Sequence, residues 1–172
     1  FIWSKFAPLL NELEGRTPTL VHNSISDSLK SFDEESVHSV WTRALQRRNN
    51  DPEGAITAAR TLLETVCKHI LDEQKIPYDA NKIELHELYT LTAKELNLSP
   101  SQHTEDVFKR VLGGCSSVIS GLGMLRNRLG DAHGQGKKPI RPAPRHAELA
   151  VNLAGSMSLF LVSTWESRNK KP

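Results

Sequence analysis

Apolar residues recur every three or four positions along most of this 172-residue chain, which is the spacing of one face of an α-helix. Asp33 and Asp51 each precede such a stripe and predict helix N-caps, and Pro52 fits the first turn of the second helix. No stretch shows the alternating pattern of a β-strand. The predicted helices span residues 1–13, 25–31, 33–48, 51–72, 83–96, 99 to about 129, and 145 to about 165.

The two longest apolar patterns differ in character. In the helix that begins near residue 99, one stripe includes Val118, Leu122 and Leu125, and the adjoining stripe includes Ile119 and continues to Arg126. Its Gly113-Gly114 pair predicts either the close approach of another helix or a kink. The final helix is apolar nearly all round, so it lies at the centre of the fold or is shared with a partner subunit. The sequence predicts an all-α bundle of about four main helices with N-terminal helical additions.

The composition and the cysteines indicate the cellular compartment of this protein. The chain is 38% hydrophobic and 24% charged, with a net charge of +2, as in ordinary globular proteins. Its two cysteines, Cys67 and Cys115, fall inside apolar helical patterns, which is typical of buried free thiols in a reducing compartment. The longest apolar run, residues 149–162, is too short to cross a bilayer and contains polar residues. We therefore expect a cytoplasmic protein without a membrane partner.

Positive charge is concentrated near one segment. Between residues 126 and 145 the chain has six Lys or Arg residues and one acidic residue, Asp131, a local net charge of 6 − 1 = +5. One interpretation is a solvated loop. The other is a surface that binds nucleic acid or phosphate, where basic side chains displace counterions. The basic residues predicted to bind nucleic acid are Arg128, Lys137, Lys138, Arg141 and Arg145.

The same segment places Arg126 and His133 seven positions apart. If the helix continues, the two residues share a face, with Gly130 between them. If it ends near Gly130, a tight loop can still return His133 to Arg126. An imidazole can exchange a proton during phosphodiester transfer, and a guanidinium can stabilise the charge of the transition state. This reaction ideally uses both a general base and a general acid, and one motif histidine per chain supplies only one of them. A two-fold dimer brings a second histidine to the same site.

Several other site types are not supported. The Gly121-Leu122-Gly123 sequence lacks the third glycine of a dinucleotide fingerprint, and no strand precedes it. The glycines of residues 130–138 have the wrong spacing for a phosphate-binding loop. Histidines and cysteines are scattered without zinc-site spacing, and no serine or cysteine nucleophile motif is present. We therefore expect no cofactor and no metal.

These residues resemble a known family. Arg126, the polar Asn127 and His133 match the R-x(4–6)-H motif of the HEPN (higher eukaryotes and prokaryotes nucleotide-binding) superfamily. The longer similarity is to the abortive-infection C-terminal domain of bacterial phage-defence proteins, over about residues 37–165. The matching segments are residues 51–56, 62–64, 101–103, 113–114, 125–134 and 141–152.

The resemblance implies an α-helical domain at residues 37–165 that dimerises about the motif helix, with an extension at 1–36 and a polar tail at 166–172. It implies a metal-independent endoribonuclease of antiphage defence, a toxin that cleaves RNA such as tRNA or mRNA. Arg126 and His133 would be catalytic, and Asn127 would orient them. The resemblance assigns no role to Asp131, whose carboxylate could support His133 by orienting it or could temper the positive charge of the basic segment. An antitoxin or sensor is a possible partner.

Two other functions stay open. Some superfamily members are inactive, so the domain could be a module that binds nucleic acid or nucleotide without cleaving it. It could also be an interaction domain that assembles through the apolar final helix and the Gly113-Gly114 contact. The basic segment argues against this last alternative.

Overall fold

A computed structural model describes residues 20–130 and 141–169, and within these ranges the chain forms six α-helices and no β-strand. The prediction of an all-α fold is confirmed. A short π-helix, η1 (Glu34–His38), leads into α3, and a 3-10 turn, η2 (Pro100–Gln102), precedes α6. The α-helices are α2 (Leu20–Phe32), α3 (Ser39–Arg47), α4 (Pro52–Glu73), α5 (Leu85–Glu95), α6 (Asp106–Gly130) and α7 (Pro144–Asn169).

Both predicted aspartate caps are confirmed. The Asp33 carboxylate accepts hydrogen bonds from the backbone N–H groups of Ser36 and Val37, at 2.7 and 3.4 Å. The Asp51 carboxylate accepts one from the N–H of Gly54 at 2.9 Å, and Pro52 occupies the first turn of α4. Each side chain satisfies a backbone donor that the helix leaves without a partner.

Two predicted helix starts are wrong. Helix α6 does not begin at residues 99–101, because Ser99 and Gln102 close η2 as a capping box and His103 then has an extended backbone. A second bond, from the Gln102 side chain to the carbonyl of Lys94, ties this turn to the end of α5 (3.0 Å). The first described helix begins at Leu20 rather than residue 25, and its buried His22 binds Asn152 of α7 at 2.9 Å.

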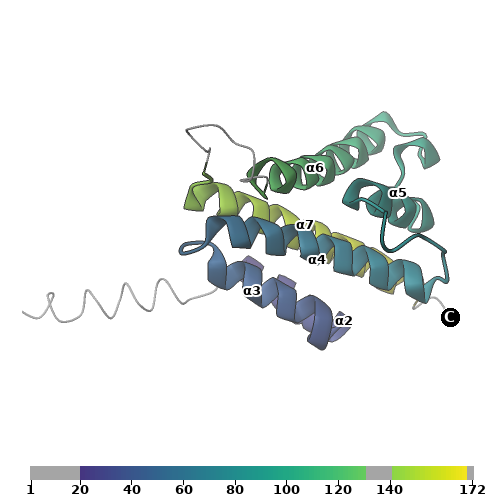
Figure 1. The fold of residues 1–172 in the computed structure, drawn as a ribbon. Helices are drawn as coiled ribbons and strands as arrows, with labels where there is room; N and C mark the ends of the chain where they lie inside the picture. Colours follow the sequence, from purple (N-terminus) through teal and green to yellow (C-terminus); the bar gives the residue numbers. More distant parts are fainter. Residues whose placement is uncertain (1–19, 131–140, 170–172) are drawn as a thin grey trace, which may run out of the picture.

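The helices α4 and α7 lie side by side through the middle of the molecule (Figure 1). On one side, α3 packs against α4 and α2 packs against α7, while α5 and α6 pack against the other side of α4. Among the described residues, α7 is the one helix long and apolar enough to cross a membrane, and 50% of that stretch is buried inside the bundle. Its central position accounts for its apolar composition.

Small side chains allow α4 and α7 to pack closely. Alanines of both helices are buried, as are larger residues such as Leu63 of α4 and Leu161 of α7. A Cβ atom added to Gly155 of α7 would lie 2.6 Å from the buried ring of Trp41 of α3, so only glycine fits there. We call this contact of Trp41 with Gly155 the central seam.

Candidate functional site

The motif predicted to be catalytic begins near the end of α6. The α6 backbone extends to Gly130 and therefore includes Arg126, Asn127 and Arg128. The side chains of residues 126–130 lie outside the described part of the structure. The same is true of all of residues 131–140, which include the predicted site residues Asp131, His133, Lys137 and Lys138. The structure thus locates the helix that bears the motif. The candidate site consists of the residues that surround the end of this helix.

One face of α6 anchors this helix to the bundle. Leu112, Ile119 and Leu122 are buried, and Arg126 follows Leu122 by four positions along the same helix. The sequence prediction that Arg126 extends an apolar face is consistent with this helical phase. The motif is therefore carried on a helix whose orientation is fixed by packing.

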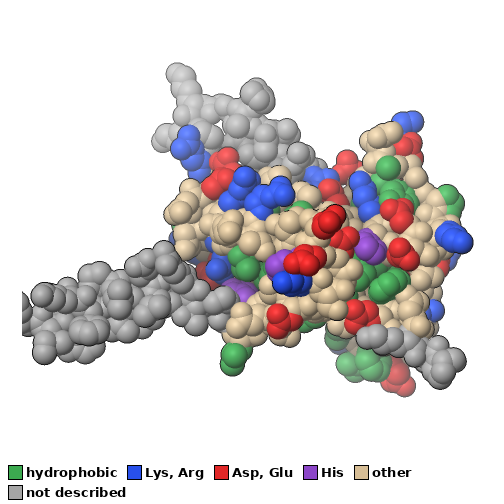
Figure 2. Space-filling model, turned by 90° about the horizontal axis from the view of Figure 1, so that it is seen from below, with side chains coloured by type: hydrophobic (Ala, Val, Ile, Leu, Met, Phe, Trp, Pro, Cys, Tyr) green, Lys and Arg blue, Asp and Glu red, His purple; other side chains and the backbone are tan. Residues whose placement is uncertain are grey.

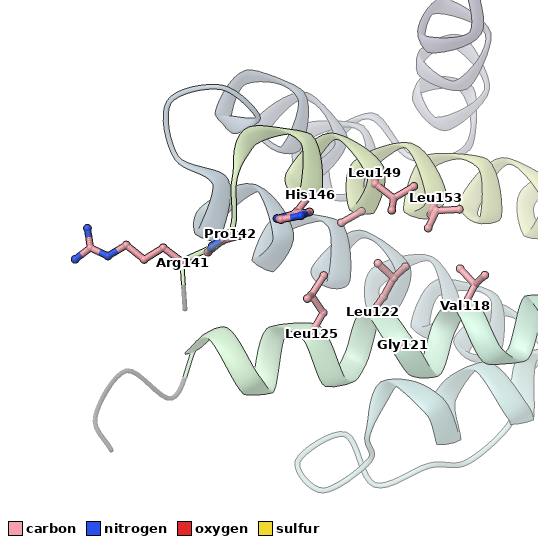
Figure 3. A pocket seen from close by; sticks show the side chains of 10 residues that line it. Val118, Gly121, Leu122, Leu125, Arg141, Pro142, His146, Leu149 and Leu153 are labelled. Carbon is pink, nitrogen blue, oxygen red and sulfur yellow. The ribbon is translucent and has the colours of Figure 1, made fainter. Parts of the chain in front are cut away.

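A cleft of about 460 Å³ separates the last turns of α6 from the first turns of α7 (Figure 3). Its walls are almost entirely apolar. Leu122 and Leu125 of α6 face Leu149 of α7 across it (Figure 3). The cleft reaches the residue that directly precedes Arg126. Its lining consists of Val118, Gly121, Leu122, Leu125, Arg141, Pro142, His146, Leu149, Ala150 and Leu153.

The mouth of this cleft is polar. Arg141 and His146 are both exposed and line it, and the guanidinium of Arg141 extends outward (Figure 3). Arg145, in the first turn of α7, is also exposed. Of the five residues predicted to bind nucleic acid, these two arginines are the ones whose side chains the structure describes, and they lie close together in the chain at the start of α7. Accessible cations at this position are suited to phosphate binding.

His146 was missed by the sequence prediction. Its Nδ1 atom accepts a hydrogen bond from the backbone N–H of Ala143 at 3.1 Å, across the first turn of α7. A histidine two residues after Pro144, in the first turn of a predicted helix, was the available signal. The sequence alone gave no reason to place it beside Leu125, because that contact depends on how α6 and α7 pack.

In the described part of the chain, no helix packs against Gly113 and Gly114. A Cβ atom added at either position, or at Gly121, would meet nothing within 4 Å among the described residues. The close approach of another helix therefore stays a prediction, and its partner would be a second molecule. Val107 and Val111 on this part of α6 are exposed, so the helix presents an apolar surface that its own bundle leaves uncovered.

A second polar cluster lies on another side of α6. The Ser120 hydroxyl and the His86 Nδ1 atom are 2.9 Å apart, beside a pocket of about 190 Å³. Glu84 lines the same pocket, but its carboxylate accepts a hydrogen bond from Arg60 at 3.0 Å. The serine and histidine therefore lack the orienting carboxylate of a nucleophilic triad among the described residues.

Charge on the opposite side of the bundle is mixed. Seen from below the view of Figure 1, acidic and basic side chains alternate over the surface without a large patch of one sign (Figure 2). A field of mixed sign does not favour binding of a polyanion. In the described residues, moreover, no group of three His, Cys, Asp or Glu side chains could hold a metal ion.

A family model described as a HEPN-like domain, Abi_C, matches residues 35–165. The match includes α3 to α6, α7 as far as residue 165, the cleft and the whole of the Arg126–His133 motif. No curated protein and no solved structure matches the chain.

Proposed function

Because the chain belongs to the HEPN-like Abi_C family, whose name points to abortive infection, we propose that it is an endoribonuclease effector of bacterial antiphage defence. The observation that supports this best is the position of the motif helix. α6 contains Arg126 and forms one wall of a cleft whose mouth is lined by Arg141 and His146. A basic mouth on an apolar cleft is suited to a ligand that has both phosphates and bases.

In the proposed reaction, a ribose 2′-oxygen attacks the adjacent phosphorus atom and the bond from phosphorus to the 5′-oxygen breaks. His133 of one copy takes the proton of the 2′-hydroxyl, and His133 of the second copy gives a proton to the leaving 5′-oxygen. Arg126 stabilises the charge that develops on the phosphoryl oxygens. Asn127 orients these two side chains, and Asp131 supports His133. The products are a 2′,3′-cyclic phosphate and a 5′-hydroxyl, and the reaction needs no metal or cofactor. We propose that it takes place in the cytoplasm.

The basic residues around the motif hold the RNA backbone. We assign this role to Arg128, Lys137, Lys138, Arg141 and Arg145. Contacts of this kind are independent of sequence and weaken as salt rises. They bring tRNA or mRNA to the cleft without selecting the cleavage site, and an antitoxin or sensor partner would restrain the activity until infection.

A homodimer completes the proposed site. Apolar residues and glycines recur along α6 at alternating spacings of four and three residues, which is the pattern of a helix–helix seam. Val107 and Val111 of this stripe are exposed, and the open space over Gly114 and Gly121 allows a second helix to approach. The part of this pattern proposed as the dimer seam is Val107, Val111 and Gly114, and Val118, Gly121 and Leu125 continue it into the wall of the cleft. Pairing of two copies along it would bring two motifs to one composite site.

Cleavage of labelled tRNA and of unstructured RNA in EDTA tests this function. The wild-type protein is compared with His133→Ala and Arg126→Ala, and the products are analysed for a 2′,3′-cyclic phosphate. We expect cleavage by the wild type alone. A metal requirement, or full cleavage by Arg126→Ala, would contradict the mechanism.

The alternative is a module that binds nucleic acid or nucleotide without cleaving it, through the same cleft. It predicts that the wild type binds RNA but leaves it intact, and that His133→Ala binds equally well. Measuring affinity and cleavage on the same RNA separates the two functions.

A further inference from the structure

His146 lies where an RNA phosphate would meet the cleft. Its ring is exposed and lines the mouth, with Leu125 of α6 across from it (Figure 3). Since Leu125 directly precedes Arg126, this mouth adjoins the part of α6 that bears the motif. The imidazole therefore lies across the cleft from the turn of α6 that directly precedes Arg126.

The hydrogen bond to Ala143 determines which ring nitrogen of His146 can donate. A backbone N–H can only donate, so Nδ1 must accept it with its lone pair, at 3.1 Å. The neutral ring then has its proton on Nε2. Among the described residues nothing accepts a hydrogen bond from Nε2, and the exposure of the ring leaves this N–H open to a ligand.

We propose that His146 binds a phosphate oxygen of the RNA through its Nε2–H group. This inference rests on the proposed function and adds a substrate-binding residue to it. A hydrogen bond to a charged phosphate oxygen is stronger than one between neutral groups. Because Nδ1 is already used, His146 acts as a fixed donor that positions the phosphodiester, and proton transfer is left to His133.

The simplest competing role is structural, because the bond to Ala143 also caps α7. His146→Glu separates the two roles. A glutamate at this third helical position can accept the Ala143 N–H as in a capping box, but it repels a phosphate. Pro144→Glu is the matched control, since it adds the same negative charge to the same exposed turn and Pro144 does not line the cleft.

The probe is a fluorescent 2′-O-methylated RNA, which has no free 2′-hydroxyl to react, and its affinity is measured by anisotropy. We expect His146→Glu to weaken binding by about tenfold or more, the scale of one charge-assisted hydrogen bond. Pro144→Glu should weaken it by less than about threefold, the effect of one exposed charge that does not contact the phosphate. Thermal melting of both variants should match the wild type.

The outcomes separate this inference from the proposed function. Equal losses in the two variants, with a wild type that cleaves RNA, would overturn the role of His146 and leave the ribonuclease intact. A selective loss in His146→Glu, with a wild type that binds without cleaving, would support the role and overturn the ribonuclease. Failure of the wild type to bind would overturn both.

Discussion

The central seam and the uncovered stripe of α6 contain the same kinds of residue in opposite surroundings. At the seam, Trp41 is 0% exposed and its ring would be 2.6 Å from a Cβ atom on Gly155. On α6, Val111 is 58% exposed and a Cβ atom on Gly114 would meet nothing within 4 Å. One set of apolar residues stabilises this chain, and the other is available to a partner.

The glycines make this difference clearest. A glycine within a helix costs about 1 kcal/mol relative to alanine, so each one needs a compensating contact. Gly155 has that contact inside the chain, against Trp41. Gly114 has none among the described residues, which is why we place its contact in a dimer. The predictions below test whether the two surfaces differ in this way.

The largest expected effect is at the seam. Trp41→Ala should lower the free energy of unfolding by about 3–5 kcal/mol, because it leaves a large cavity in the core. The Trp41 Nε1 atom is buried without a hydrogen-bond partner in the described structure, so this loss is one of packing. Phe108→Ala on α6 is the control, since Phe108 is 60% exposed. It should change stability by less than about 0.5 kcal/mol in dilute monomer. Urea denaturation of both variants measures the contrast.

A charge on the exposed α6 stripe should break the dimer and spare the fold. Val111 is 58% exposed in this stripe, and Val111→Glu should raise the dimer dissociation constant by about 100-fold or more, from a charge that is buried without a partner in the dimer. Met124→Glu places the same charge on an exposed α6 residue outside this stripe (67% exposed) and should leave the dimer intact. Sedimentation velocity gives the oligomeric state. A wild type that is monomeric at high concentration would remove the dimer from the proposal.

Replacing glycine by alanine should change the free energy of unfolding in opposite directions on the two surfaces. Gly155→Ala should destabilise the fold by about 1–3 kcal/mol, because the Trp41 ring has no room to move. Gly113→Ala should stabilise it by up to about 1 kcal/mol, since the added methyl group meets open space and favours the helix. Thermal unfolding under identical conditions compares the two. If Gly113→Ala also destabilised the chain, the α6 surface would be covered in solution.

Much of the fold was predictable because its signals are local. Asp33 and Asp51 cap the helices that their sequences predict, and the π-helix at residues 34–38 is a detail that apolar spacing does not encode. The start of α6 was missed because Pro100 and Gln102 favour a helix start locally, while the bond from Gln102 to Lys94 ties this turn to α5 instead.

The site was less predictable because it depends on packing between distant segments. The sequence located the motif and its charge, but the cleft exists only because α6 and α7 separate near Leu125. His146 became a candidate only once α7 was placed beside that residue. Whether a glycine pair faces the chain or a partner is likewise a tertiary property, as the contrast between Gly155 and Gly113 shows.

The smallest expected effect is a difference between the two cysteines in their rate of reaction with a thiol reagent. Cys67 in α4 is fully buried, and burial raises its pKa to about 12, so its thiolate is scarce at neutral pH. Cys115 in α6 is half-buried, and burial raises its pKa too. A thiol reagent needs both access and thiolate, so Cys115 should react first and Cys67 only when the bundle opens. Mass spectrometry of the folded protein during labelling measures the two rates.

The raised pKa of Cys67 also determines in which direction the stability of the folded state changes with pH. The unfolded thiol ionises near its ordinary pKa of 9.0, whereas the folded thiol keeps its proton until about 12. The folded state thus binds more protons in that window, and its stability should fall as the pH rises from 9.0 toward 12. Cys67→Ala should show a shallower fall, and Cys115→Ala should follow the wild type more closely, because Cys115 is only half-buried. Equal pH slopes in the wild type and Cys67→Ala would mean that water reaches Cys67 in the folded protein.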